Sequence, residues 1–201
     1  MKAAADVVAV TAAPGALSRA LAAPGRERWL WLLAPGAHPR PDALELLKAA
    51  IEPPESARAA IVAGVVVDPD GASVAAELPA GDRHDDAAVI RLAGVRVLPI
   101  RSAPFAHCLV DRTTFAEHGL PDERTYGRHA AREWSARVLR GSPGYLAATS
   151  VAVLERPRPV PTTSQALRAL APTLRMTRTG AWTRGESVEA LVDLAGAVLR
   201  R

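Results

Sequence analysis

The chain has 201 residues, 49% of them hydrophobic, which is enough to fill the core of one domain. Its net charge is only +4, its arginines are scattered singly and only 4% of its residues are aromatic, so no nucleic-acid partner is expected. The lone Cys108 excludes an internal disulfide framework, and Asp6 and Pro14 interrupt any signal-peptide core. No run of about 18 apolar residues predicts a membrane span, so we expect a cytoplasmic protein.

The first half of the chain predicts alternating strands and helices. Short β-branched or continuously apolar runs are typical of strands that are covered on both faces. A proline followed by an acid is typical of a helix start, because proline fits the first helical position and an acid favours the positive end. On these patterns we expect a strand at residues 7–10, a helix at 16–22, a strand at 29–33 with the sequence WLWLL, a helix opened by Pro41 and Asp42, and a strand at 61–67.

The second half continues this alternation and ends in a separate segment. The predicted elements are a strand at 95–99, a strand at 106–110, a short helix that ends at His118, a helix at 129–139 and a strand at 146–154. Residues 155–161 are rich in proline and predict a boundary, after which two helices follow. We therefore expect an α/β fold with a mostly parallel mixed sheet flanked by helices, formed by residues 1–160. A C-terminal helical extension, residues 161–201, is expected to pack on this domain.

Four stretches resemble, in order, the landmarks of the family 2 glycosyltransferases, whose fold is called GT-A. Residues 29–47 (WLWLLAPGAHPRPDALELL) are similar to an apolar strand that ends in Asp-x-Asp, a Pro-x-Pro segment and a helix. Residues 61–71 (IVAGVVVDPDG) resemble the strand and turn that follow. Residues 105–145 resemble the acceptor-side region, with the phrase Gly-Leu-Pro-Asp-Glu and a helix that ends in Arg and Gly, and residues 149–154 resemble the last strand. The resemblance covers residues 29–160 and implies a GT-A-like sheet, shortened in the N-terminal half of the nucleotide-binding region.

The resemblance implies a chemistry for which this chain lacks the side chains. Family 2 glycosyltransferases move a sugar from a nucleotide diphosphate to an acceptor hydroxyl, commonly with a divalent cation held by carboxylates and with a carboxylate base. The positions that match the metal-binding acids are Ala34 and Gly36, and those that match the acidic pair with the base are Ala130 and Ala131. None of the four has a side-chain oxygen, so we expect no catalytic residue of the family, no metal and no cofactor.

Other residues near these positions are weaker candidates. His129 could act as a base, but we interpret it as a solvated histidine in the first turn of a helix. Glu133 could act as the base as well, but its i,i+4 spacing favours a structural pair with Arg137. The candidate substrate-binding side chains, two arginines for a diphosphate and a tryptophan that could face a sugar, are Arg128, Arg132 and Trp134.

Two further pairs are assigned to the core. His107 and Cys108 are neighbours in a predicted strand, so their side chains point to opposite faces and cannot bond to each other. Cys108 is therefore expected to be a small core residue rather than a nucleophile. Trp29 and Trp31 share one face of their strand and are expected in the core as well.

These observations lead to two expectations of function and leave a third open. The first is a catalytically degenerate pseudo-glycosyltransferase that binds a glycan, a nucleotide sugar or an active glycosyltransferase. The alternative is an active, metal-independent glycosyltransferase that uses a nucleotide-diphosphate donor, with Arg128 or Arg132 neutralising the diphosphate. A basic binding module unrelated to sugars stays open, because a fold does not determine a function.

Overall fold

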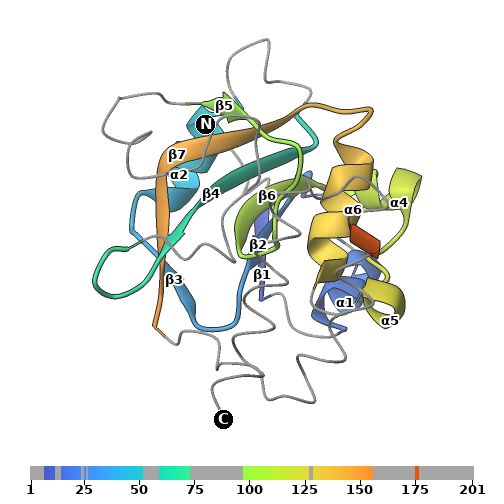
Figure 1. The fold of residues 1–201 in the computed structure, drawn as a ribbon, viewed down its shortest axis with the longest axis horizontal. Helices are drawn as coiled ribbons and strands as arrows, with labels where there is room; N and C mark the ends of the chain where they lie inside the picture. The colour runs from blue at the N-terminus through green and yellow to red at the C-terminus, as the bar shows by residue number, and fades with distance from the viewer. Residues whose placement is uncertain are drawn as a thin grey trace.

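The protein is built around one sheet of seven strands in the part that the computed structural model describes, namely residues 7–11, 15–23, 25, 27–51, 59–72, 97–126, 129–155 and 175–176 (Figure 1). The strands are β1 (Val7–Thr11), β2 (Trp29–Leu33), β3 (Ala37–Pro39), β4 (Ile61–Val67), β5 (Leu98–Pro99), β6 (His107–Asp111) and β7 (Gly144–Leu154). The helices are α1 (Ala16–Ala22), α2 (Ala43–Ala49), α4 (Arg112–His118), α5 (Glu123–Tyr126) and α6 (Ala130–Val138).

The sheet is mixed. Its strand order is β1-β2-β6-β4-β7-β3, and β5 pairs with β7 outside this path. β1 and β2 pair in parallel, as do β4 and β7, whereas β6 runs antiparallel to both β2 and β4. β1, β2, β4 and β7 therefore share one direction, and their C-terminal ends lie at one edge of the sheet. Open α/β sheets bind their ligands at that edge.

The expected α/β class and the mixed sheet flanked by helices are confirmed, but the sheet is less parallel than we expected. Only two of the six pairings between the described strands are parallel. The reason is that β6 enters the middle of the sheet in the opposite direction, and that β3 and β5 both add antiparallel to β7.

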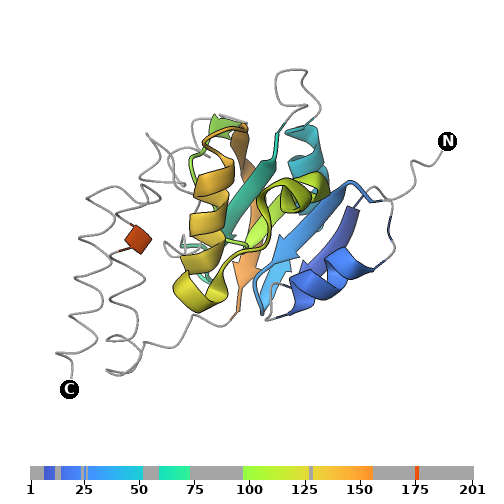
Figure 2. The ribbon, with the colours of Figure 1, turned by 90° about the vertical axis from the view of Figure 1, so that its right-hand side faces the viewer.

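Helices cover both faces of the sheet (Figure 2). Leu30 and Leu32 of β2 pack into the core that also contains residues of α1, α4 and α6, whereas Trp29 packs with Leu47 of α2. Trp31 packs against the same cluster as Trp29, so the two rings share one face as predicted, but Trp31 is half-buried and only Trp29 is a core residue. Every residue of β4 is buried, as expected for a central strand that is covered on both sides.

Each predicted element within the described residues has an observed counterpart, although of the strand predicted at 95–99 the described part is a strand only at Leu98–Pro99. The strands predicted at 29–33 and 61–67 coincide with β2 and β4, and the helix predicted at 16–22 coincides with α1. The predicted C-terminal helices lie outside the described residues, apart from Arg175 and Met176, which are helical. Met176 is fully buried, and Arg175 Nη1 donates to the carbonyl oxygen of Thr125 in α5 at 3.3 Å. None of the helices in the described ranges is long and apolar enough to cross a membrane.

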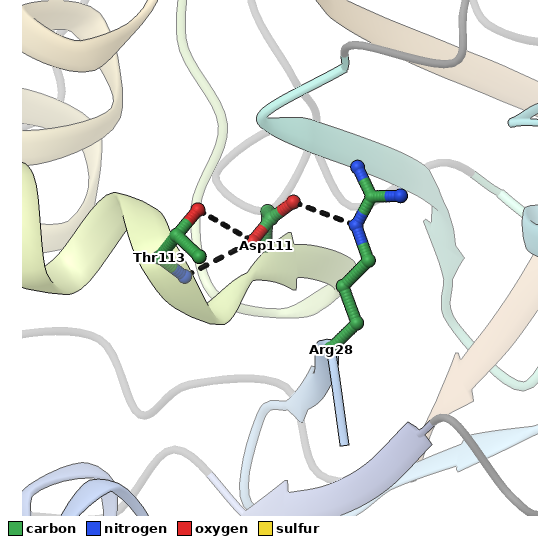
Figure 3. Close-up of polar contacts among 3 residues, drawn as sticks. All are labelled: Arg28, Asp111 and Thr113. Carbon is green, nitrogen blue, oxygen red and sulfur yellow. Dashed lines mark hydrogen bonds and ion pairs between the residues drawn. The ribbon is translucent and has the colours of Figure 1, made fainter. Parts of the chain in front are cut away.

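A polar clamp joins α1, β2 and α4 at the end of the sheet opposite to the C-terminal edge (Figure 3). Asp111 caps α4: its Oδ1 accepts from the backbone N and the Oγ1 of Thr113 at 3.0 and 2.8 Å. Its Oδ2 accepts from Arg28 Nε, just before β2, at 2.9 Å. Arg112 Nη2 donates to the last carbonyl oxygens of α1, those of Ala20, Leu21 and Ala23.

Candidate functional site

The position that matches the first metal-binding acid, Ala34, is packed in the core. Ala34 follows the last residue of β2 and is only 6% exposed. Its side chain belongs to an apolar cluster with Val66, Ala106 and Leu154. Its backbone N donates to the carbonyl oxygen of Ala106 at 2.8 Å, which continues the pairing of β2 with β6. The strand end is therefore closed by apolar contacts.

The second of these positions, Gly36, lies in a tight turn between β2 and β3. The backbone N of Ala37 donates to the carbonyl oxygen of Ala34 at 3.0 Å, and Gly36 has φ of 80°. Proline at the second position of a turn and glycine with positive φ at the third are the pattern of a type II turn. The carbonyl oxygen of Gly36 also accepts from the backbone N of Glu155 at 3.3 Å. The backbone here thus reverses direction where the family has its Asp-x-Asp motif.

The positions that match the acidic pair lie in the first turn of α6. Ala130 is 3% exposed and Ala131 is half-buried. Figure 2 shows this first turn at the same end of the ribbon as the C-terminal ends of β2 and β7. The two sets of positions that the resemblance assigns to catalysis therefore lie at one end of the molecule, and neither carries a carboxylate.

The interpretation of His129 as solvated is wrong. His129 is the residue before α6 and is only 7% exposed, because the start of this helix, including Ala130, packs inward. Its side chain makes no capping hydrogen bond to the helix.

The structural role expected for Glu133 is confirmed. Glu133 is 5% exposed, and its carboxylate lies 3.4 Å from Nε of Arg137, one helical turn later. Arg137 Nη1 also donates to the carbonyl oxygen of His118 at 2.7 Å, at the end of α4. The pair therefore fastens α6 to α4, and the carboxylate is engaged rather than presented to a ligand.

Trp134, a candidate for facing a sugar, is fully buried in an aromatic cluster. Its ring stacks on Phe115 with centroids 4.5 Å apart and meets the edge of Phe105 at 5.4 Å. Its Nε1 donates to the carbonyl oxygen of Gly119 at 2.7 Å. The indole therefore serves packing in this conformation. Of the two candidate arginines, Arg132 is half-buried on α6, and Arg128 lies outside the described residues.

A buried polar chain that the sequence analysis did not anticipate runs through His107. Its Nδ1 accepts from Trp31 Nε1 at 3.2 Å, its Nε2 lies 2.8 Å from Ser150 Oγ, and Ser150 Oγ donates to the carbonyl oxygen of Ala43 at 2.8 Å. Burial lowers the pKa of His107 to about 4, so the ring is neutral near pH 7. A single sequence does not reveal which strands pair, so it could not predict that His107 and Trp31 would meet.

Cys108 points away from this chain, into the core on the other face of the sheet. It is fully buried, and its Sγ donates to the carbonyl oxygen of Pro104 at 3.7 Å. Burial raises the pKa of its thiol, which suppresses the nucleophilic thiolate. The expected core role of Cys108 is confirmed.

Two of the acidic side chains near the C-terminal edge, Asp68 and Glu155, already have partners. Asp68 Oδ1 accepts from the backbone N of Ala72 at 2.8 Å in the turn after β4, and Glu155 lies 3.4 Å from His38 Nε2. No group of three or more His, Cys, Asp or Glu side chains in the described part of the chain could hold a metal ion. No protein-family model matches the chain, and no curated protein matches it significantly.

Proposed function

We propose that this chain is a catalytically degenerate, GT-A-like glycosyltransferase domain that acts by binding a glycan, a nucleotide sugar or an active glycosyltransferase. The observation that carries the proposal is the turn Ala34-Pro35-Gly36-Ala37 at the end of β2. It replaces the two carboxylates by a buried methyl group and by a glycine with positive φ.

The order of the elements supports the GT-A-like part of this proposal. The four stretches that resemble the family correspond to β2 with α2, to β4, to β6 with α4 and α6, and to β7. The strands β2, β4 and β7 share one direction, and their C-terminal ends lie at one edge. A ligand of the family would be bound at that edge.

The burial and the backbone conformation of these positions support the loss of metal binding, in addition to the missing carboxylates. An aspartate at position 34 would place a carboxylate among Val66, Ala106 and Leu154, where a charge is costly without a partner. An aspartate at position 36 would have to adopt φ of 80°, a left-handed conformation that aspartate adopts only occasionally. Restoring the acids would therefore not restore the site.

Thermal unfolding with nucleotide and metal tests the proposal. An intact donor site with a dissociation constant of about 10 μM, given about 1 mM ligand, would stabilise the protein by ~2.7 kcal/mol. For a chain of this size the melting temperature would rise by roughly 5–11 °C. We expect no such rise with uridine or guanosine diphosphate and manganese, in the wild type or in the double variant Ala34→Asp/Gly36→Asp.

Two other outcomes would contradict the proposal. A rise that requires both metal and nucleotide would mean that an intact metal site exists elsewhere in the chain. A rise with nucleotide alone, abolished in Arg132→Ala, would favour the metal-independent glycosyltransferase, because Arg132 lies in the first turns of α6 at the same end of the molecule. Binding to immobilised glycans, to an intact nucleotide sugar or to a purified glycosyltransferase, without an effect of the free nucleoside diphosphate, is the result that the proposal expects.

A further inference from the structure

The ring of His107 lies where three strands and a helix meet. It extends from β6 and touches β2 through Trp31 and β7 through Ser150, and Ser150 in turn reaches the first residue of α2. His107 is 2% exposed and Ser150 is fully buried, so the bonds among His107, Ser150 and Ala43 are shielded from water, and the bond to the half-buried Trp31 is partly shielded. Hydrogen bonds in such surroundings are strong, and a missing partner is costly.

The backbone of β4 is shaped to receive this ring. A Cβ atom at Gly64 would overlap the His107 ring and would approach the carbonyl oxygen of Ser150 to 2.7 Å. The pairing of β4 with β7 also shifts register between Ala63 and Val65, on either side of this glycine. The ring therefore occupies a space that only a glycine at position 64 leaves free.

The partners determine where the imidazole protons are. The indole Nε1 of Trp31 can only donate, so His107 Nδ1 must accept and carry no proton. Ser150 Oγ uses its own proton toward the carbonyl oxygen of Ala43, so Nε2 donates to Ser150. A second proton on the ring would have to sit on Nδ1 and would face the N–H of Trp31. Two donors would then point at each other in a buried place.

Within the elements that the structure describes around the ring, no charged side chain stands ready to stabilise its protonated form. The residues of β2 and β4 contain no titratable group, and β7 contains only Tyr145, five residues before Ser150. On α2, Glu45 and Lys48 pair with each other at 3.0 Å on the exposed side. The remaining titratable groups of β6 and β3 are engaged elsewhere or on another face: Cys108, Asp111 and His38.

We propose that His107 is an acid-sensitive latch: protonation of its ring breaks the hydrogen bond to Trp31, whose indole packs in the same apolar cluster as Leu47 of α2, and thereby loosens α2 and the end of β2. The loosened segment leads directly into the Ala34–Gly36 turn and the edge where the family binds its donor. Acid would therefore loosen this end of the molecule while the opposite end, held by Asp111 and Arg112, stays closed. The inference concerns the fold of this edge and stands whether or not the proposed function is correct.

Burial lowers the pKa of His107 to about 4, and an opened state would have the ordinary value near 6.5. Opening should therefore become about 20-fold more frequent between pH 7 and pH 5, because the open state gains the proton first. Amide hydrogen exchange measures this directly, once intrinsic rates are corrected for pH. We expect the increase in β2 and in the first turn of α2, and no increase in α4.

Three variants make the test specific. His107→Asn keeps an oxygen near the Nδ1 position, and His107→Gln keeps an amide NH₂ near the Nε2 position, and neither titrates. His38→Asn removes an exposed histidine, whose side chain is 61% accessible to solvent, and leaves the latch intact. The proposal expects a flat pH profile for β2 in the first two variants and the wild-type profile in the third. Equal profiles in the wild type and in His107→Gln would overturn it.

A measurement on the wild type alone covers the case in which the His107 variants do not fold. Nitrogen chemical shifts of the imidazole report the tautomer and the titration of each histidine. We expect His107 to carry its proton on Nε2 and to remain neutral down to pH 5 while the protein is closed. The indole N–H signal of Trp31 should change together with it in more acidic solution. A His107 ring that titrates near pH 6.5 in the folded protein, or that is protonated on Nδ1, would contradict the latch.

Discussion

At the scale of single residues, the turn after β2 depends on the backbone of Gly36, whose φ is 80°. A Cβ atom at this position would meet no atom within 4 Å, so space does not require a glycine there. What requires it is the left-handed conformation, which L-residues adopt only at a cost. The residue that stands where the resemblance places a metal-binding acid is thus also the residue that permits the turn.

We expect Gly36→Ala to lower the free energy of unfolding by about 1–2 kcal/mol, because the methyl group forces strain without any clash. Gly141→Ala is the matched control: this glycine also has open space around it, but its φ is not in the left-handed region. The control should be neutral or slightly stabilising. Urea denaturation of both variants measures the difference, and equal effects at the two positions would mean that backbone conformation does not limit position 36.

At the scale of elements, a serine links α6 to the segment before β6. Ser135 Oγ donates to the carbonyl oxygen of Ala103 at 2.8 Å and accepts from the backbone N of Ala103 at 2.9 Å. Both residues are fully buried. One hydroxyl thus satisfies two backbone groups of a segment that belongs to no regular element at that point.

Ser135→Ala should destabilise the protein by about 1–3 kcal/mol, because it leaves the N–H of Ala103 buried without its acceptor. Ser18→Ala, at an exposed position of α1, is the control and should be neutral or slightly stabilising, since alanine favours a helix. The free energies of unfolding are compared by chemical denaturation. A cost below about 0.5 kcal/mol for Ser135→Ala would show that water replaces the hydroxyl.

The elements that could be predicted from the sequence have local causes, whereas the others depend on contacts with distant parts of the chain. β2 and β4 were predicted because five and seven consecutive apolar residues need cover on both faces. β3 and α5 were not predicted. β3 has only three residues, which include Pro39, and is held by pairing with β7. α5 is a single helical turn that is held by contacts with α6. The chain through His107 escaped prediction for the same reason, because it depends on which strands become neighbours. The turn at Gly36, in contrast, carries a local signal in Pro35 and Gly36.

At the scale of the whole molecule, the neutral His107 ring makes stability depend on pH. Burial places its folded-state pKa at about 4, below the ordinary value of 6.5. The contribution is fully present above about pH 6.5, and it is lost as the pH falls from 6.5 towards 4 because the unfolded chain takes up the proton first. The loss amounts to about 3 kcal/mol, since each pKa unit corresponds to ~1.36 kcal/mol.

We therefore expect the free energy of unfolding, measured in urea at pH 7, 5.5 and 4.5, to fall more steeply in the wild type than in His107→Gln. The variant has the same carboxylates, so the difference between the two slopes isolates the histidine. His38→Asn should follow the wild type, because the His38 imidazole is exposed and its partner, Glu155, is exposed as well. Parallel slopes for all three proteins would mean that His107 is protonated equally in the folded and unfolded states.

The clamp at Asp111 and Arg112 also has a consequence for how the chain is made. Arg112 caps carbonyl groups of α1 from 92 residues later in the sequence, and Asp111 binds Arg28 from 83 residues later. A ribosome that adds roughly 5–20 residues per second needs roughly 4–18 s to deliver them. During those seconds β1, α1 and β2 have emerged without β6, the strand that covers the open edge of β2. The leucines of β2 are then exposed to solvent, so the nascent chain is most in need of a chaperone before residue 112 leaves the ribosome.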